Sequence, residues 1–258
     1  VNDAPALRSA NIGIAMGSGT DIARETSKMI VLDDNFKSIV NGVLEGRVAY
    51  ANVRKIIYFL ISCGISEVLC FCLATLFNMD MPLVAIQILW LNVVTDGIQD
   101  LSLSFERAER DIMKEPPRDP KESLFDKTLL EQTMFSGAII GLLLFGMWYY
   151  LINIAKMDIT TARGYVMTLM VFIQNIHVFN CRSEKNSAFT IPLKNNKLVV
   201  WGVIASIALQ IIVMEVDIFA KLLQTVSIPV SHLTGLFALA LIILIVVEIY
   251  KKLRFHHE

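Results

Sequence analysis

The amino-acid sequence predicts a mainly α-helical membrane protein in which a six-helix transmembrane bundle follows part of an α/β unit. Hydrophobic residues make up 55% of the 258 positions and charged residues 18%, against about 25% charged in ordinary soluble domains. Six stretches approach the roughly 20 apolar residues that a helix needs to cross a bilayer, and none contains Lys or Arg. They are residues 56–77, 83–105, 133–155, 164–180, 198–215 and 233–250. We therefore predict a multi-pass membrane protein surrounded by lipid.

The first 37 residues have the pattern of a soluble strand–helix–strand unit. Residues 11–16 (NIGIAM) predict a short buried strand, and residues 29–32 (MIVL) predict a second one. Between them, Thr20 can cap a helix whose first turn carries Asp21, an acidic residue favoured at the positive end of a helix. This spacing favours parallel pairing of the two strands. Two strands make no stable parallel sheet alone, so we expect more of the sheet to come from preceding sequence.

After residues 33–34 the sequence turns helical and shows no clear stop before the first apolar stretch. A single helix from Ser38 to Phe77 would be roughly 60 Å long at 1.5 Å per residue, and could connect a cytoplasmic domain to the middle of the membrane. The alternative is two helices with a break near Gly42–Gly46. The predicted domains are residues 1–37 (end of a soluble domain), 38–55 (stalk helix) and 56–258 (six-span membrane domain with its tail).

Basic residues in the connections predict the orientation, because cytoplasmic loops carry an excess of Lys and Arg. The loop 107–132 holds six, the loop 181–197 holds four and the C-terminal tail holds three. The opposite side holds only Lys156, Arg163 and Lys221. We therefore expect the N-terminal segment, both long loops and the C-terminus in the cytoplasm. The net charge of −1 offers no general attraction for a polyanion, so we expect no nucleic-acid partner.

Polar side chains inside the apolar stretches indicate a candidate site, because an ionisable group is costly within a membrane. Glu67 lies at the midpoint of the first stretch. In the second stretch, Asn92, Thr95 and Asp96 stand at positions i, i+3 and i+4, and should share one helix face. Gly97 follows and can loosen the helix, which frees backbone carbonyls. Such oxygen donors suit a hard cation like Ca²⁺, which takes about six to eight oxygen ligands.

Structural alternatives remain open for these polar residues. Glu67 and Asp96 could form a protonated, hydrogen-bonded pair without any cation. Asp100, one turn beyond Asp96, could line the cytoplasmic exit of a site. The fourth stretch adds Gln174, Asn175 and His177. The two amides could equally form hydrogen bonds between helices, which are common in membranes, and the histidine could be a packing residue.

Several motifs resemble those of one enzyme family. VNDAPAL at the start, followed by NIGIAMG at 11–17, resembles the phosphorylation-domain motif of P-type ATPases, in which the first stretch reads GDGVNDAPAL. LWLNVVTDG at 89–97, DIMKEPPR at 111–118 and a Glu in the preceding helix look like type II cation pumps. The resemblance is greatest to calcium ATPases of the sarco/endoplasmic-reticulum type and their bacterial relatives, and is strongest over residues 1–118.

This resemblance implies the end of a haloacid-dehalogenase-like phosphorylation domain, followed by the fifth to tenth transmembrane helices of the family. Asn2 and Asp3 match residues that support the phosphoryl group and Mg²⁺ at an aspartyl-phosphate. The positions that match ligands of the transported cation are Glu67, Asn92, Thr95, Asp96 and, at the eighth-helix position, Gln174. The implied function is ATP-driven export of Ca²⁺ from the cytoplasm, with protons carried in the other direction.

Two positions depart from the calcium pumps that have two ion sites. Those pumps have Asn in the fifth helix and Glu in the eighth, where this chain has Gly64 and Gln174, so we expect one Ca²⁺ per cycle. The sequence holds no DKTG phosphorylation motif and no nucleotide-binding domain. We therefore expect an upstream part of the same pump as a partner, and no ATP hydrolysis by these 258 residues alone.

Other transport functions are compatible with part of the pattern. Sodium/potassium pumps also have Gln at the eighth-helix position, but they carry Asp where this chain has Asn92. A passive six-helix channel or a secondary transporter could also contain carboxylates within the membrane. A channel or a secondary transporter has no use for a phosphoryl-supporting motif in a strand–helix–strand unit, so this motif favours a pump over both.

Overall fold

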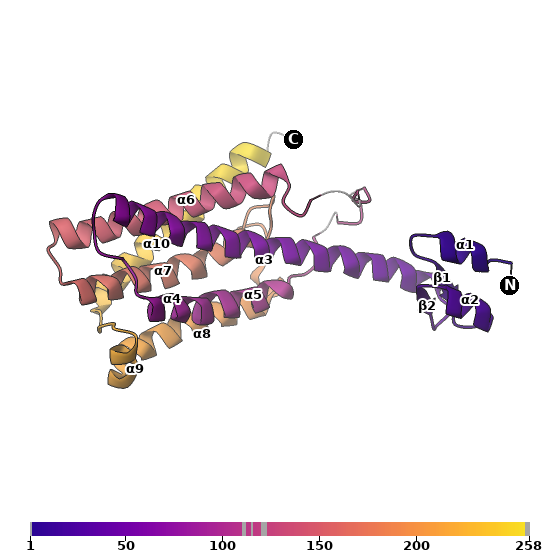
Figure 1. Cartoon of the computed structure of the whole chain (residues 1–258), viewed down its shortest axis with the longest axis horizontal. Coiled ribbons are helices and arrows are strands. Elements are labelled where there is room, and N and C mark those ends of the chain that lie inside the picture. The colour runs from indigo at the N-terminus through magenta and orange to yellow at the C-terminus, as the bar shows by residue number, and fades with distance from the viewer. Residues whose placement is uncertain (1, 110–111, 115, 120–122, 256–258) are drawn as a thin grey trace. The chain divides into compact units, whose positions relative to one another are not determined.

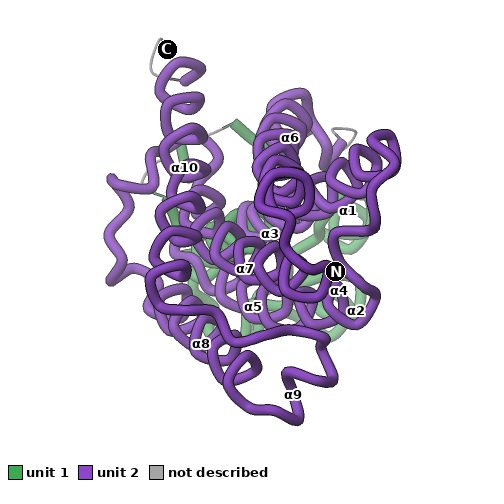
Figure 2. The backbone as a smooth tube through the Cα atoms, turned by 90° about the vertical axis from the view of Figure 1, so that its left-hand side faces the viewer, with its two compact units in different colours: residues 1–50, 108–117 green, residues 51–107, 118–258 purple. Residues whose placement is uncertain are grey.

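The structure is a computed structural model that describes residues 2–109, 112–114, 116–119 and 123–255. It contains two compact units, residues 1–50 with 108–117 and residues 51–107 with 118–258, coloured separately in Figure 2. Arg110 and Lys121 of the predicted basic loop lie outside the described residues, as do Val1, Asp111 and Glu115 of the motifs.

The first unit contains the predicted strand–helix–strand. Strand β1 (Ile14–Met16) pairs in parallel with β2 (Met29–Val31), and α2 (Asp21–Thr26) connects them. Thr20 caps α2 by accepting the Ala23 N–H at 3.4 Å, as predicted. Gly17 follows β1 where a Cβ atom would lie 2.8 Å from the Leu32 carbonyl oxygen, so the turn has room only for glycine. A short helix that was not predicted, α1 (Ala4–Ser9), precedes β1.

Helix α3 (Phe36–Leu76) is one unbroken helix of 41 residues (Figure 1). The continuous-helix prediction is therefore confirmed, and the break considered near Gly42 and Gly46 does not occur. No atom lies within 4 Å of a Cβ built at either glycine, so no neighbour forces a bend there. The helix ends just before Asn78, whose φ of 53° is the left-handed conformation that commonly terminates helices.

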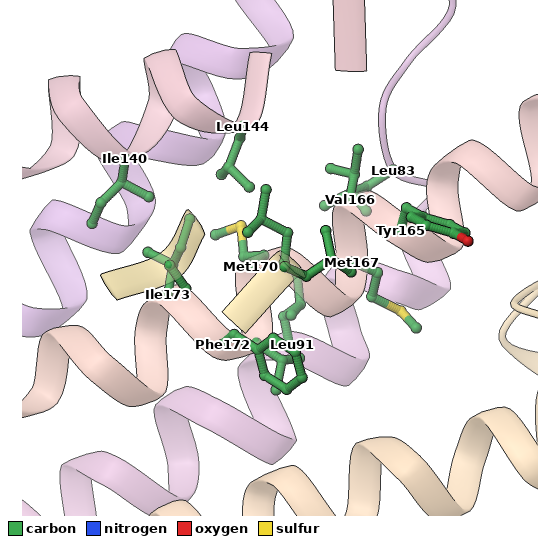
Figure 3. Packing of buried hydrophobic residues seen from close by; sticks show 14 of the residues in the cluster. Leu83, Leu91, Ile140, Leu144, Tyr165, Val166, Met167, Met170, Phe172 and Ile173 are labelled. Atoms are coloured by element: carbon green, nitrogen blue, oxygen red, sulfur yellow. The ribbon is translucent and has the colours of Figure 1, made fainter. Parts of the chain in front are cut away.

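The second unit is a bundle of helices that includes α3 from Ala51 onward (Figure 1). Its elements are α4 (Ala85–Leu91), the π-helical turn η1 (Asn92–Asp96), α5 (Gly97–Ser104), α6 (Lys127–Tyr149), the π-helical turn η2 (Tyr150–Ile154), α7 (Ile159–Cys181), the 3₁₀ turn η3 (Leu193–Asn195), α8 (Lys197–Glu215), α9 (Asp217–Leu222) and α10 (Val230–Phe255). Helix α7 packs against α6, α8 and α10, and almost all of its side chains after Ala162 are buried. Figure 3 shows the packing of this core around Met170 and Ile173.

Among the described residues, four helices are long and apolar enough to cross a membrane: α3, α6 with η2, α8 and α10. The two other predicted stretches are helical but differ from a plain apolar span. Residues 83–105 divide into α4, η1 and α5. Residues 164–180 lie in α7, which contains several buried amides and a histidine, and these polar groups lower its mean hydropathy.

Candidate cation site

The candidate site lies at the π-helical turn η1, where the predicted cation ligands of the second stretch occur. The backbone N–H of Gly97 donates to the carbonyl oxygen of Asn92, five residues earlier, in place of the four-residue spacing of an α-helix. A Cβ atom at Gly97 would lie 3.4 Å from that same oxygen, an ordinary van der Waals contact, so the turn does not itself require glycine at this position. Turns of this kind are frequent at functional sites.

The three oxygen-bearing side chains of η1 have different environments. Thr95 is fully buried, and its hydroxyl donates to the Leu91 carbonyl at 2.6 Å and contacts Oε1 of Gln174 on α7. Asp96 is half-buried, whereas Asn92 is exposed. The prediction that Asn92, Thr95 and Asp96 share one face stays a prediction; Asn92 and Asp96 lie about one helical turn apart in η1.

Asp96 of this turn has two further carboxylates within electrostatic reach. Glu67 on α3 and Asp96 are close enough for their charges to interact, and so are Asp96 and Asp100. All three also interact electrostatically with the buried thiol of Cys63 on α3. One side-chain oxygen of Asp96 and one of Asp100 are buried without a hydrogen-bond partner among the described residues. Buried oxygens of this kind are usually satisfied by a water molecule, an ion or another polar group, and eight other buried side-chain atoms of the described residues share this state.

Carboxylates alone do not complete a metal site here. Among the described residues, no group of three or more His, Cys, Asp or Glu side chains could hold a metal ion. Gly64, at a position predicted to lack a ligand, is exposed and has no atom within 4 Å of an ideal Cβ. A cation at this turn would therefore also need amide, hydroxyl or backbone oxygens, which Asn92, Thr95 and the π-helical backbone can supply.

The amides of α7 mainly form hydrogen bonds between helices, which was the alternative to cation binding considered for them. Asn175 accepts from Gln99 Nε2 at 2.8 Å and donates to the Ser206 hydroxyl at 2.7 Å, so it joins α5, α7 and α8. Gln174 contacts Thr95, but its Nε2 is buried without a described partner. Gln99 and Gln210, whose amides also join helices, were not predicted as polar contacts, although an amide inside an apolar stretch is the same signal that indicated Gln174.

His177 is a packing residue in this structure. Its Nε2 atom lies 2.9 Å from the Ser62 hydroxyl, and its ring packs edge-on to Tyr58 and stacks against Phe59. All of these neighbours belong to α3 and precede Glu67 in that helix, so His177 packs α7 against α3 on the N-terminal side of Glu67. This outcome agrees with the structural alternative considered for it.

Buried ion pairs at the helix ends were not predicted from the sequence. Arg182, which follows α7, pairs with Glu106 after α5 at 2.8 Å, and both side chains are at most 3% exposed. Arg54 on α3 pairs with Glu184 at 2.7 Å and with Asp126 at 2.9 Å. Glu184 beside it raises the pKa of the Arg54 guanidinium above its usual range. The pairs join segments more than 70 residues apart, which no local pattern reveals.

Asn2 and Asp3, the predicted phosphoryl-supporting residues, lie in the first unit before α1 and are both exposed. The backbone carbonyl of Asp3 accepts the Leu7 N–H at 2.9 Å, so Asp3 stands at the start of α1 with its carboxylate free of a capping bond. In the same unit, the Ser18 N–H donates to Asp34 and lowers the pKa of that carboxyl.

The chain is similar to the C-terminal part of known cation-transporting ATPases. Residues 80–253 match the family described as cation transporting ATPase, C-terminus. A probable calcium-transporting ATPase of Trypanosoma brucei brucei is 36% identical over 254 residues, covering 90% of this chain and 25% of the relative. A calcium-transporting ATPase of Bacillus subtilis is 37% identical over 229 residues, covering 88% of the chain and 26% of the relative.

A third relative is the human calcium-transporting ATPase type 2C member 1, which is 36% identical over 262 residues, covering 100% of this chain and 28% of the relative. The chain thus spans about a quarter of the length of these relatives. The family match covers the π-helical turn, α7 and the ion pair of Arg182 with Glu106. Because this match extends over most of the sequence, the chain belongs to the C-terminal family of the cation-transporting ATPases.

Proposed function

We propose that the chain is the C-terminal part of an ATP-driven pump that exports Ca²⁺ from the cytoplasm. The observation that carries the proposal is the pair of buried, unpartnered oxygens on Asp96 and Asp100, together with the electrostatic interaction between Asp96 and Glu67. A membrane offers such oxygens no water, so a cation is the ligand that compensates their burial. The choice of Ca²⁺ is supported by the three relatives, each named as a calcium-transporting ATPase.

One Ca²⁺ per cycle fits the side chains around the turn. Gly64 contributes no ligand, and Oε1 of Gln174 is already engaged by Thr95. Asn92 and Asp96 would bind the ion together with backbone oxygens of η1. Glu67 would act mainly as the proton carrier, because a carboxylate left in a membrane without its cation is stabilised by taking up a proton.

The cytoplasmic chemistry involves Asn2 and Asp3. The exposed carboxylate of Asp3 is a hard oxygen donor of the type that Mg²⁺ binds, and the Asn2 amide can donate to a phosphoryl oxygen. When bound, Mg²⁺ and ATP supply the phosphoryl transfer that forms an aspartyl-phosphate. The nucleophile and the ATP site belong to other parts of the pump, so the 258 residues alone insert in the membrane without hydrolysing ATP.

The proposed topology has six crossings, with the N-terminal segment and the C-terminus in the cytoplasm. From Ala85 to Ser104, α4, η1 and α5 form 20 consecutive helical residues, which is about 30 Å and matches the apolar thickness of a bilayer. Helix α7 has 23 residues and is enclosed by its neighbours, so its polar groups need not face lipid. The basic loops support this orientation.

The test uses the native polypeptide that contains these residues, purified and supplied with radiolabelled ATP. We expect acid-stable phosphorylation that requires Ca²⁺ and does not occur with Na⁺, K⁺ or Mn²⁺ alone, with one Ca²⁺ bound per phosphorylated site. Phosphorylation that depends on Na⁺ would indicate a sodium/potassium-type pump. The absence of any phosphoenzyme, combined with ion flux down a gradient, would indicate a passive channel or secondary transporter and overturn the proposal.

A further inference from the structure

A cavity of about 370 Å³ opens on α10 beside the loop that follows α7. Pockets for small molecules and cofactors commonly enclose about 300–1,000 Å³. One wall is apolar and consists of Ile245 and Ile249 of α10 with Phe189 of the loop. All three side chains are more than half exposed, so the second unit itself leaves this wall uncovered.

The other part of the cavity is basic. Lys185 on the loop and Lys252 on α10 line it and are exposed, and neither forms a hydrogen bond or ion pair within the part of the chain that the structure describes. On α10, Ile245, Ile249 and Lys252 follow one another at spacings of four and three residues, so they lie on one helix face. The cavity therefore changes from apolar to cationic along that face.

The one carboxylate in the cavity is already neutralised. Glu248 accepts from Nδ2 of Asn180 at 3.1 Å through one oxygen and from the Ala188 N–H at 3.1 Å through the other. Its partner Lys251 lies 3.7 Å away and donates to the backbone carbonyls of Asn180 and Ser183. Glu248 and Lys251 cancel each other, which leaves the two exposed lysines as the net charge of the cavity.

We propose that this cavity, the α10 pocket, binds the phosphate headgroup of an anionic phospholipid, with its acyl chains along Ile245 and Ile249. Lys185 and Lys252 would contact the phosphate, and the Ser187 hydroxyl, which lines the same cavity, can donate a hydrogen bond to it. Helix α10 is largely apolar until it reaches Lys251 and Lys252. Basic pockets beside transmembrane helices bind anionic lipid headgroups, so this composition fits a lipid site. A soluble anion would leave the apolar wall unused.

The proposed orientation places this pocket in the cytoplasmic leaflet, where anionic lipids are abundant. Only the choice of leaflet rests on the proposed function. Lipid binding can be measured in detergent without regard to orientation or ion transport, so a negative result here leaves the cation site untouched.

The experiment is native mass spectrometry of the native polypeptide that contains these residues, purified in detergent micelles and titrated with dioleoylphosphatidylglycerol or with zwitterionic dioleoylphosphatidylcholine. We expect phosphatidylglycerol to bind with defined stoichiometry and phosphatidylcholine to bind at least tenfold more weakly. The double variant K185Q/K252Q should lose about thirtyfold in affinity for phosphatidylglycerol, since each lysine near an anionic lipid contributes substantially to binding.

The matched control is K194Q/K197Q, which removes the same charge from two exposed lysines of the same region outside the pocket. It should bind phosphatidylglycerol like the parent chain. Equal losses in both double variants would show a general charge effect and overturn the proposal. Equal binding of the two lipids would also overturn it, as would full competition by millimolar glycerol phosphate, which would indicate an anion site that does not use the acyl chains.

Discussion

At the scale of single residues, Asp96 is the side chain on which the proposed cation site depends. It is the half-buried carboxylate within η1 itself, and one of its oxygens has no described partner. We expect Asp96→Asn in the native polypeptide to abolish Ca²⁺-dependent phosphorylation from ATP, because it removes the charge and keeps the shape. Phosphorylation backward from inorganic phosphate should survive, since that reaction takes place in the cytoplasm.

The matched control for this change is Asp80→Asn, an exposed aspartate outside the site, which should leave both reactions unchanged. Transport by Asp96→Asn at the parent rate and affinity would show that the carboxylate is structural. The two variants together separate the loss of a ligand from a general effect of removing one negative charge.

A second residue-scale prediction concerns the buried pair of Arg182 and Glu106. Replacing Arg182 by Met leaves the buried Glu106 carboxylate with Asn196 as its one remaining side-chain partner among the described residues. Removing one partner of a buried ion pair costs about 3–5 kcal/mol, so the variant should melt at a clearly lower temperature in detergent.

The double variant E106L/R182M should recover much of this stability, because it leaves no buried charge unpaired. Lys194→Met, at an exposed position, serves as the control. If Arg182→Met and Lys194→Met melt alike, the ion pair does not stabilise the helix ends.

At the scale of helices, two glycines of α6 determine how closely it approaches α3. A Cβ atom at Gly137 would lie 2.7 Å from Ile65 and 2.9 Å from the Ser62 carbonyl, and one at Gly141 would lie 2.9 Å from the Ser66 carbonyl. Small residues four apart allow this contact between membrane helices. We expect Gly137→Val to force the helices apart and lower the stability by about 1–3 kcal/mol.

The control is Gly146→Val in the same helix, where no atom lies within 4 Å of the added Cβ. Thermal melting in detergent compares the two variants, which carry the same chemical change. Equal melting temperatures would mean that α6 and α3 do not depend on this contact.

The elements that could be predicted from the sequence are those governed by local patterns. The short apolar segments at residues 11–16 and 29–32 and the cap at Thr20 were sufficient for the strand–helix–strand, and the absence of a stop signal was sufficient for α3. The turn η1 was only partly foreseen: Gly97 indicated a weak point, but the pattern could not distinguish a π-helical turn from unwinding. Whether Gln174 binds a cation or Thr95 depends on contacts between helices that are distant in the sequence. The spacing of residues along one helix cannot predict such contacts.

At the scale of the whole molecule, the number of membrane crossings is the property that decides the topology. Six crossings place Ser123 in the cytoplasm and Lys156 on the opposite side, whereas four crossings by α3, α6, α8 and α10 alone reverse both. Labelling with a membrane-impermeant maleimide measures this directly. We expect Ser123→Cys to react only from the cytoplasmic side and Lys156→Cys only from the other.

These labelling variants are made in a Cys72→Ser background, because Cys72 is the exposed cysteine and the other three are buried. Lys194→Cys, which is cytoplasmic in both arrangements, controls for access of the reagent. The reverse labelling pattern would establish four crossings and contradict the proposed six-helix topology.

The π-helical turn also keeps the buried residues before and after it on one face of the helix. Leu91 and Gln99 are both fully buried, yet eight residues of α-helix turn by about 800°, which is about 80° too far for a common face. The turn absorbs one surplus residue, so the pair behaves like residues seven apart. Deleting Val93, which is 60% exposed, should therefore keep the buried face aligned and the melting temperature unchanged, while Ca²⁺ binding is lost. Leu101 is 65% exposed and lies in α5, which contains no extra residue. Deleting Leu101 should therefore misalign the buried face and destabilise the bundle.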